Sequence, residues 1–213
     1  MSKLAFELMR AETPTDFRLE IGEVDAQNLL GSKKALDHLV RNHLLQTQGK
    51  PGNRRIRFCH QSLQEYYAAE AMLVMLEDNH PDVMDDQRLQ YFYLNYLKWT
   101  EPLAMMLSLL EYETQVVRVV QVALDVDLML GARLAGEVQP QLQRQSVNLV
   151  MKRPVPQLVQ IQLMGKTRSD TVIPKLLLLL RDGDFDTRYA VSHAFGEIGS
   201  SAAVAVLEPS FTR

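Results

Sequence analysis

The sequence contains a single cysteine, Cys59, among its 213 residues. One thiol excludes an internal disulfide and a zinc site built from several cysteines. Long apolar runs are also missing: the five consecutive leucines from Leu176 to Leu180 fall far short of the roughly 20 residues that a membrane-spanning helix needs. The first residues lack the apolar stretch and cleavage site of a secretory signal peptide. We therefore expect a soluble, cytoplasmic protein that does not bind membranes.

An excess of one charge sign is missing as well. The 23 Lys and Arg residues stand against 26 Asp and Glu residues, for a net charge of −3. This balance excludes a strongly basic chain that coats nucleic acid through overall charge, and it excludes an acidic tail.

Catalytic motifs are absent too. The zinc-protease motif H-E-x-x-H and the hydrolase motif G-x-S-x-G do not occur. The phosphate loop G-x-x-x-x-G-K-[ST] is absent: Gly131 and Gly136 have its glycine spacing, but Glu137 and Val138 stand at the Lys and Ser/Thr positions. We expect no catalytic residues, no metal site and no enzyme activity in this chain alone.

What is present is mostly helical periodicity, and the first helices are short. Leu4, Leu8 and Met9 share one face of a helix over residues 1–12. The alternation over 17–21 predicts a short strand. Asp25 is expected to cap a helix that ends at Gly31, and Ser32 to cap the next one.

Residues 43–58 have the pattern of a β-hairpin. Segments 43–47 and 54–58 flank a Gly-Lys-Pro-Gly turn, and Ile56 and Phe58 alternate with arginines. A long helix should follow, with one buried stripe formed by Tyr66, Ala69, Leu73 and Leu76. Helices followed by a hairpin predict a small winged-helix-like module over residues 1–78.

The remaining chain is helical almost throughout. We expect helices at 87–98, 102–112, 114–130, 140–152 and 172–181, then another capped by Asp186. Met164-Gly165 recurs as Ile198-Gly199, 34 residues later, and periods of this size are typical of α-solenoids. The expected organisation is a helical linker or array over 79–140 and HEAT-like repeats over 141–213, the last of them incomplete. The fold class is thus mainly α.

Two segments resemble the region that follows the nucleotide-binding domain in NACHT-family STAND NTPases. The string I-R-F-C-H-Q-S-L-Q-E-Y-Y-A-A over residues 56–69 is similar to the family's winged-helix signature F-x-H-x-S-F-Q-E-Y/F-F-A-A, with Leu63 and Tyr67 where the family prefers Phe. Residues 173–199 resemble a HEAT repeat, in which Asp182 and Arg188 match the typical turn Asp and helix Arg. The resemblance implies the regulatory and partner-binding part of a bacterial signalling or defence NTPase.

In that family the signature histidine faces the phosphates of bound ADP, a role that would fall on His60. The simpler alternative is that His60 caps its helix or packs under the hairpin. The resemblance further implies an upstream NACHT domain as a partner, ADP or ATP bound only there, and an unknown protein or ligand on the solenoid. Because the last repeat is incomplete, its exposed face would also favour self-association.

A second function fits the same region. Lys50, Arg54, Arg55 and Arg57 make the predicted hairpin basic, and they are candidate contacts for an anion or a partner. A basic winged helix can also bind duplex DNA through phosphate contacts. DNA binding is therefore the alternative hypothesis, and the net negative charge of the chain counts against it.

Overall fold

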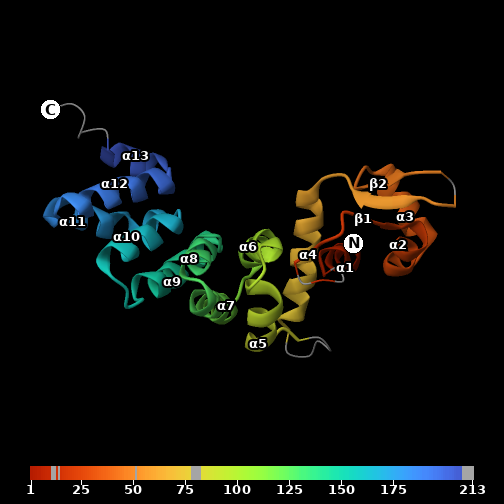
Figure 1. The fold of residues 1–213 in the computed structure, drawn as a ribbon, viewed down its shortest axis with the longest axis horizontal. Helices are drawn as coiled ribbons and strands as arrows, with labels where there is room; N and C mark the ends of the chain where they lie inside the picture. The colour runs from red at the N-terminus through yellow and green to blue at the C-terminus, as the bar shows by residue number, and fades with distance from the viewer. Residues whose placement is uncertain (11–12, 14, 51, 78–82, 208–213) are drawn as a thin grey trace. The chain divides into compact units, whose positions relative to one another are not determined.

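The computed structural model of the protein describes residues 1–10, 13, 15–50, 52–77 and 83–207. These residues are mainly helical and include one small antiparallel sheet, which confirms the expectation of a mainly α protein (Figure 1). The chain divides into two compact units, unit 1 (Met1–Met106) and unit 2 (Leu107–Arg213). The finer segments 1–78, 79–140 and 141–213 stay predictions.

Unit 1 combines helices with the sheet. Its elements, in chain order, are α1 (Ser2–Arg10), β1 (Glu20–Gly22), α2 (Glu23–Leu30), α3 (Lys33–Arg41), β2 (Leu45–Gln48), β3 (Arg55–Phe58), α4 (Gln61–Met75), α5 (Asp86–Arg88), the π-helical turn η1 (Leu89–Leu94), the 3₁₀ turn η2 (Leu97–Trp99) and most of α6 (Thr100–Leu109). The strand order is β1-β3-β2, and both pairings are antiparallel.

The predicted hairpin and the helix after it are confirmed. In β3, Ile56 and Phe58 are buried whereas Arg55 and Arg57 are exposed, as the period of two in a strand requires. At the turn between β2 and β3, Gly49 has φ 99° and Gly52 has φ 89°, a region that other residues rarely adopt. These two glycines therefore allow the backbone to turn there.

Helix α1 packs against α4. The predicted apolar stripe of α1 is confirmed, since Leu4, Leu8 and Met9 are all buried. The stripe predicted for α4 is partly wrong because Tyr66 is 38% exposed, and a polar residue, Gln64, is buried on this helix instead. The Gln64 side-chain amide donates to the Arg18 carbonyl at 3.1 Å, which makes its burial tolerable.

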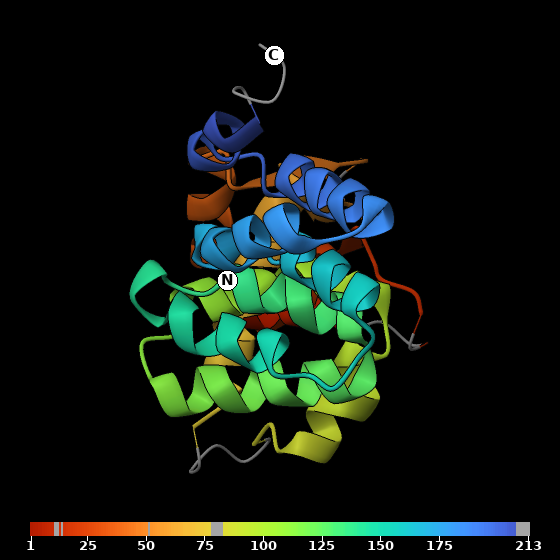
Figure 2. The same ribbon diagram turned by 90° about the vertical axis from the view of Figure 1, so that its left-hand side faces the viewer.

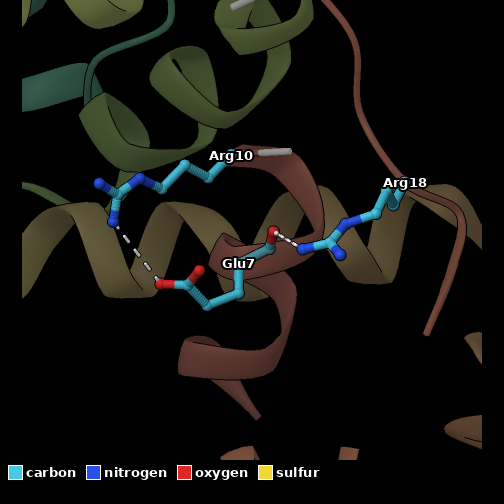
Figure 3. Close-up of polar contacts among 3 residues, drawn as sticks. All are labelled: Glu7, Arg10 and Arg18. Atoms are coloured by element: carbon cyan, nitrogen blue, oxygen red, sulfur yellow. Dashed lines mark hydrogen bonds and ion pairs between the residues drawn. The ribbon is translucent and has the colours of Figure 1, made fainter. Parts of the chain in front are cut away.

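The segment after α1 returns along that helix (Figure 3). The Arg18 guanidinium donates to the Glu7 carbonyl at 3.3 Å, and the Arg18 backbone N–H donates to the Leu8 carbonyl at 2.8 Å. Beside them, Arg10 forms a 3.9 Å ion pair with Glu7. Because Arg18 bonds to α1 and not to the sheet, β1 begins only at Glu20, later than the predicted strand start at residue 17.

Lys98 and three aromatic rings join η1 and η2 to α1. The Lys98 ammonium donates to the carbonyls of Arg10 at 3.1 Å and Asp16 at 2.5 Å, and burial lowers the pKa of Lys98. Trp99 lies 5.4 Å from Phe6 and 5.0 Å from Tyr93 between ring centroids. Such ring pairs supply a large buried apolar area, so this cluster forms a core of unit 1.

The regular secondary structure in the described residues of unit 2 is all helical. It contains the end of α6 followed by α7 (Glu113–Val126), α8 (Leu128–Gly136), α9 (Pro140–Met151), α10 (Gln157–Lys166), the 3₁₀ turn η3 (Asp170–Val172), α11 (Ile173–Asp182), α12 (Phe185–Ile198) and α13 (Ser201–Leu207). Consecutive helices pack as pairs, α7 with α8, α9 with α10, and α11 with α12. Alternate helices also pack, since α8 contacts α10 and α10 contacts α12 (Figure 2).

Glycines and buried polar side chains set the spacing of these helices. A Cβ atom on Gly131 would lie 2.6 Å from the backbone nitrogen of Leu124, so α7 and α8 approach closely there. A Cβ atom on Gly136 would likewise collide with the Thr167 backbone. These packing roles account for the two glycines that have phosphate-loop spacing. The buried Ser146 hydroxyl donates to the Ala135 carbonyl at 2.6 Å and so ties α9 to α8.

Four of the predicted helices need correction. The helix expected over 87–98 is not one α-helix but the sequence α5, η1 and η2. The helix expected over 114–130 is two helices, because Asp127 adopts an extended backbone and its carboxylate accepts from the Leu130 N–H at 2.8 Å to cap α8. Asp184, and not Asp186, caps α12. Gly22, and not Asp25, is the N-cap of α2.

By contrast, two other predicted boundary residues are confirmed. Gly31 ends α2 with φ 83°, and the Ser32 hydroxyl caps α3.

No helix in the described ranges combines the length and the apolar character that crossing a membrane would require.

Candidate functional site

His60 lies where the sequence placed it, between the end of β3 and the start of α4. It is the N-cap residue of α4 and has an extended backbone with φ −135° and ψ 142°. Its side chain is exposed and forms no capping hydrogen bond to the described part of α4. The alternatives of a capping ring or a ring packed under the hairpin therefore do not describe this geometry. The exposed imidazole can meet a group from another domain or molecule.

The second turn of α4 carries a carboxyl group with a perturbed pKa, that of Glu65. Burial is the main cause that raises the pKa of Glu65, the side-chain amide of Gln61 lowers it through a 2.8 Å hydrogen bond, and the charge of Glu101 raises it. The first turn of α4 contains no acidic residue, and a helix N-terminus favours an anionic ligand.

The basic hairpin is less free than its sequence indicates. Arg55 forms a 3.1 Å ion pair with Glu20, and Arg54 forms a 3.8 Å ion pair with Glu23. The Arg57 guanidinium donates twice to the side-chain oxygen of Gln46, at 3.1 and 3.2 Å. The fourth predicted contact residue, Lys50, is also exposed, but its side chain bonds to no described residue.

Helix α3 presents a second basic surface. Lys33, Lys34 and Arg41 are exposed, while Leu36 faces the core. The Arg41 guanidinium nitrogen Nε donates to the backbone carbonyl oxygen of Asp37 at 3.2 Å. This contact is with a neutral group and not with the Asp37 carboxylate, so it does not neutralise the charge of Arg41. This helix follows α2 after a tight turn at Gly31 and Ser32, the order of a helix-turn-helix.

The predicted repeat turn pair, Asp182 and Arg188, forms no direct interaction at the turn between α11 and α12 in the described residues. Asp182 ends α11 and Arg188 lies in α12, and no hydrogen bond or ion pair links them among the residues described. The turn carboxylate that matters is that of Asp184, which accepts from the Thr187 N–H at 2.9 Å. That hydrogen bond is the largest cause that lowers the pKa of Asp184, and the charge of Arg188 lowers it further.

A groove that sequence reasoning missed lies on unit 2. It has a volume of about 650 Å³ and is formed by alternate helices. Its lining residues are Met129 from α8, Leu158, Gln162 and Lys166 from α10, and Asp186, Tyr189, Ala190, His193 and Glu197 from α12. On α10 and α12 these residues recur every three or four positions, so each helix presents one continuous face. That spacing was the only signal in the sequence, and any exposed helix face shares it.

Reactive and metal-binding groups are sparse. Cys59 is free and half-buried. Within the described ranges, no three His, Cys, Asp or Glu side chains come together as a metal site would require.

Comparison with known proteins adds no relatives, since no family model, no curated protein and no solved structure matches the chain.

Proposed function

We propose that this chain is the regulatory and partner-binding part of a NACHT-type STAND NTPase, acting in signalling or defence. In this proposal, residues 1–78 sense the nucleotide bound by a separate NACHT domain, and the helices of unit 2 bind a partner. The observation that carries the proposal is the exposed His60 ring at the junction of β3 and α4, within a segment that resembles the family signature.

The order of elements supports a winged-helix assignment for residues 1–78. Helices α2 and α3 form the helix-turn-helix, β2 and β3 form the wing, and β1 pairs with β3 through Ile21 opposite Ile56. The wing and the start of α4 are therefore tied to one small sheet. A module of this kind can move as a rigid body when a bound nucleotide is released.

The pairing of helices supports an α-solenoid assignment for unit 2. Each of the pairs α7/α8, α9/α10 and α11/α12 is a helix–turn–helix unit, and α8, α10 and α12 pack in succession. Stacked pairs bury a continuous core and leave a broad surface for ligands. The groove lies on the second helices of these pairs, where such a surface is expected.

The sensing role can be tested with ADP retention. A polypeptide in which a NACHT domain precedes this chain is purified, and the ADP that stays bound through gel filtration is measured. His60→Ala should release ADP at least about tenfold faster, because a hydrogen bond to a charged group contributes about 1.5–3 kcal/mol. The matched control is His38→Ala, which removes an exposed histidine of α3. Equal retention by the wild type and His60→Ala would reject the role of His60.

DNA binding remains the second candidate because α3 is a basic helix within a helix-turn-helix. A titration with a DNA duplex at two salt concentrations tests it. If α3 binds the phosphates, replacing Lys33 and Lys34 with Gln should make the slope of log binding constant against log salt concentration shallower by about 2. The matched control replaces Lys152 and Lys175, which lie in unit 2. Absence of salt-dependent binding by the wild type would remove this candidate.

A further inference from the structure

The groove on unit 2 has rigid walls. The side-chain amide of Gln157, at the start of α10, donates to the Thr187 hydroxyl, near the start of α12, at 3.4 Å. At the other end of both helices, Lys166 forms a 3.7 Å ion pair with Glu197. The two helices are therefore parallel and joined at both ends. A ligand would meet a surface that is already formed, which lowers the entropy cost of binding.

Close backbone packing also holds α10 and α12 together. A Cβ atom on Gly165 would lie 2.9 Å from the Cα atom of Ala194, so α10 and α12 touch nearly backbone to backbone. Gly165 and Ala194 are the sequence neighbours of Lys166 and His193, which line the groove. Side chains wider than hydrogen at Gly165 would push the two helices apart.

The two ends of the groove differ in charge. At the end near the C-termini of α10 and α12, the charges of Lys166 and Glu197 are paired. At the opposite end, Asp186 is exposed, and its carboxylate has no hydrogen-bond or ion-pair partner in the described structure. Tyr189 is one turn further along α12 and is 71% exposed. The unpaired negative charge is thus concentrated at one end, beside an aromatic ring.

Apolar surface lies beside the acidic end, because Leu158 is the second residue of α10 and Asp186 is in the first turn of α12. Leu158 of α10 is 43% exposed and Met129 of α8 is 39% exposed. A Lys or Arg side chain fits this combination, because its methylene groups cover apolar surface while its charged end meets a carboxylate and the face of a tyrosine ring. The charged residues that line the groove are two carboxylates and one ammonium, so an anionic ligand such as a phosphate group is disfavoured.

We propose that the groove formed by α8, α10 and α12 binds a basic segment of a partner protein, with a Lys or Arg side chain against Asp186 and Tyr189 and an apolar side chain against Leu158 and Met129. This inference deepens the partner-binding role proposed for unit 2 and rests on that role, but it does not depend on His60. It specifies the partner by the chemistry of its recognition segment, a cation beside an apolar group.

Fluorescence anisotropy with the full chain and short labelled peptides tests the proposal. The probe peptide alternates Lys and Leu, and the comparison peptides alternate Glu and Leu or Lys and Ser. The wild type should bind the Lys-Leu peptide more tightly than either comparison peptide. Asp186→Asn and Tyr189→Ala should each weaken that binding about fivefold or more, because an ion pair and a cation–π contact are lost.

Matched controls separate the groove from the general surface. Asp182→Asn removes an exposed carboxylate at the end of α11, and Tyr112→Ala removes a tyrosine that is 69% exposed outside the groove. Both should bind like the wild type, and circular dichroism should show an unchanged fold for all four variants. Equal weakening by the control variants, or tight binding of the Glu-Leu peptide, would overturn the proposal.

Light scattering tests the competing occupant, a second copy of the chain. A dimer that dissociates in Asp186→Asn would assign the groove to self-association and overturn the proposal. A wild-type chain that binds the Lys-Leu peptide as a monomer supports it. These measurements use the chain without nucleotide. A negative result here would therefore count against the groove proposal alone, whereas a negative ADP-retention result would count against the sensing role of His60.

Discussion

The two units of the molecule can be compared by whether their exposed charged side chains have bonding partners within the same unit. In unit 1, the conspicuous arginines of the hairpin bond within the same unit, as Arg55 does to Glu20 and Arg57 does to Gln46. In unit 2, Asp186 borders a groove without a partner in the described chain. A cluster of charge in a sequence therefore does not by itself identify a binding surface, because its charges can be satisfied locally. Charges without a local partner, such as Lys50 in unit 1 and Asp186 in unit 2, are the better guide to a binding surface.

The units also differ in how their elements are held together. Unit 1 uses large side chains, with Phe6, Tyr93 and Trp99 packed as a ring cluster. Unit 2 has glycines at its helix contacts, where Gly131 and Gly165 let neighbouring helices approach closely. An aromatic cluster tolerates changes around its edges, whereas a glycine contact between backbones leaves no space for added atoms.

The largest expected effect is the loss of the ring cluster in unit 1. Trp99 is 2% exposed, so Trp99→Ala should lower the free energy of unfolding by about 3–5 kcal/mol, which combines lost burial with a cavity. Denaturant unfolding followed by far-UV circular dichroism measures it. Phe92 in η1 is 62% exposed and is the matched control, for which a change within about 0.5 kcal/mol is expected. Similar losses for both variants would show that unit 1 does not depend on this cluster.

A smaller effect is expected when a methyl group is added in unit 2. Gly131→Ala should lower the free energy of unfolding by about 1–3 kcal/mol, because its Cβ atom would lie 2.6 Å from a backbone atom of Leu124 that cannot move aside. Thermal and denaturant unfolding of the full chain measure the change.

Gly196→Ala is the control for the same chemical change. Gly196 lies within α12, and nothing lies within 4 Å of the position that its Cβ atom would take. Ala favours a helix over Gly by about 0.5–1 kcal/mol, so this variant should gain stability. If both glycine variants gained stability, close backbone contact would not be what distinguishes unit 2.

Much of the backbone was predictable because it depends on local rules. The alternation of Ile56 and Phe58 with arginines sets a strand, and Gly31 and Ser32 set the end of one helix and the start of the next. Candidate caps were harder. Asp184 and Asp186 both precede an apolar stretch, and only the path of the chain decides which carboxylate reaches the N–H groups of α12.

The candidate sites show the same limit. The position of His60 follows from its place between a predicted strand and a predicted helix, and the structure has it there, exposed. The groove could not be predicted, because Leu158 and Tyr189 are far apart in sequence and become neighbours only when α10 packs on α12. The burial of Gln64 was missed for a similar reason, since its partner is the carbonyl of a distant residue, Arg18.

The smallest expected effect separates the units by the pH dependence of their helix caps. In unit 2, the N–H of Thr187 holds the pKa of Asp184 below its ordinary value of 3.8, so the cap stabilises the folded state above that pH and is lost as pH falls through the lowered pKa. In unit 1, the Ser32 hydroxyl accepts from the Ala35 N–H at 3.1 Å and carries no charge. Ser32→Ala should therefore cost about 1 kcal/mol at every pH. Asp184→Ala should destabilise at neutral pH and approach the wild type at acidic pH, as denaturant unfolding between neutral pH and pH 3 can measure. Parallel pH profiles for the two variants would mean that the carboxylate of Asp184 caps α12 no differently from a neutral hydroxyl.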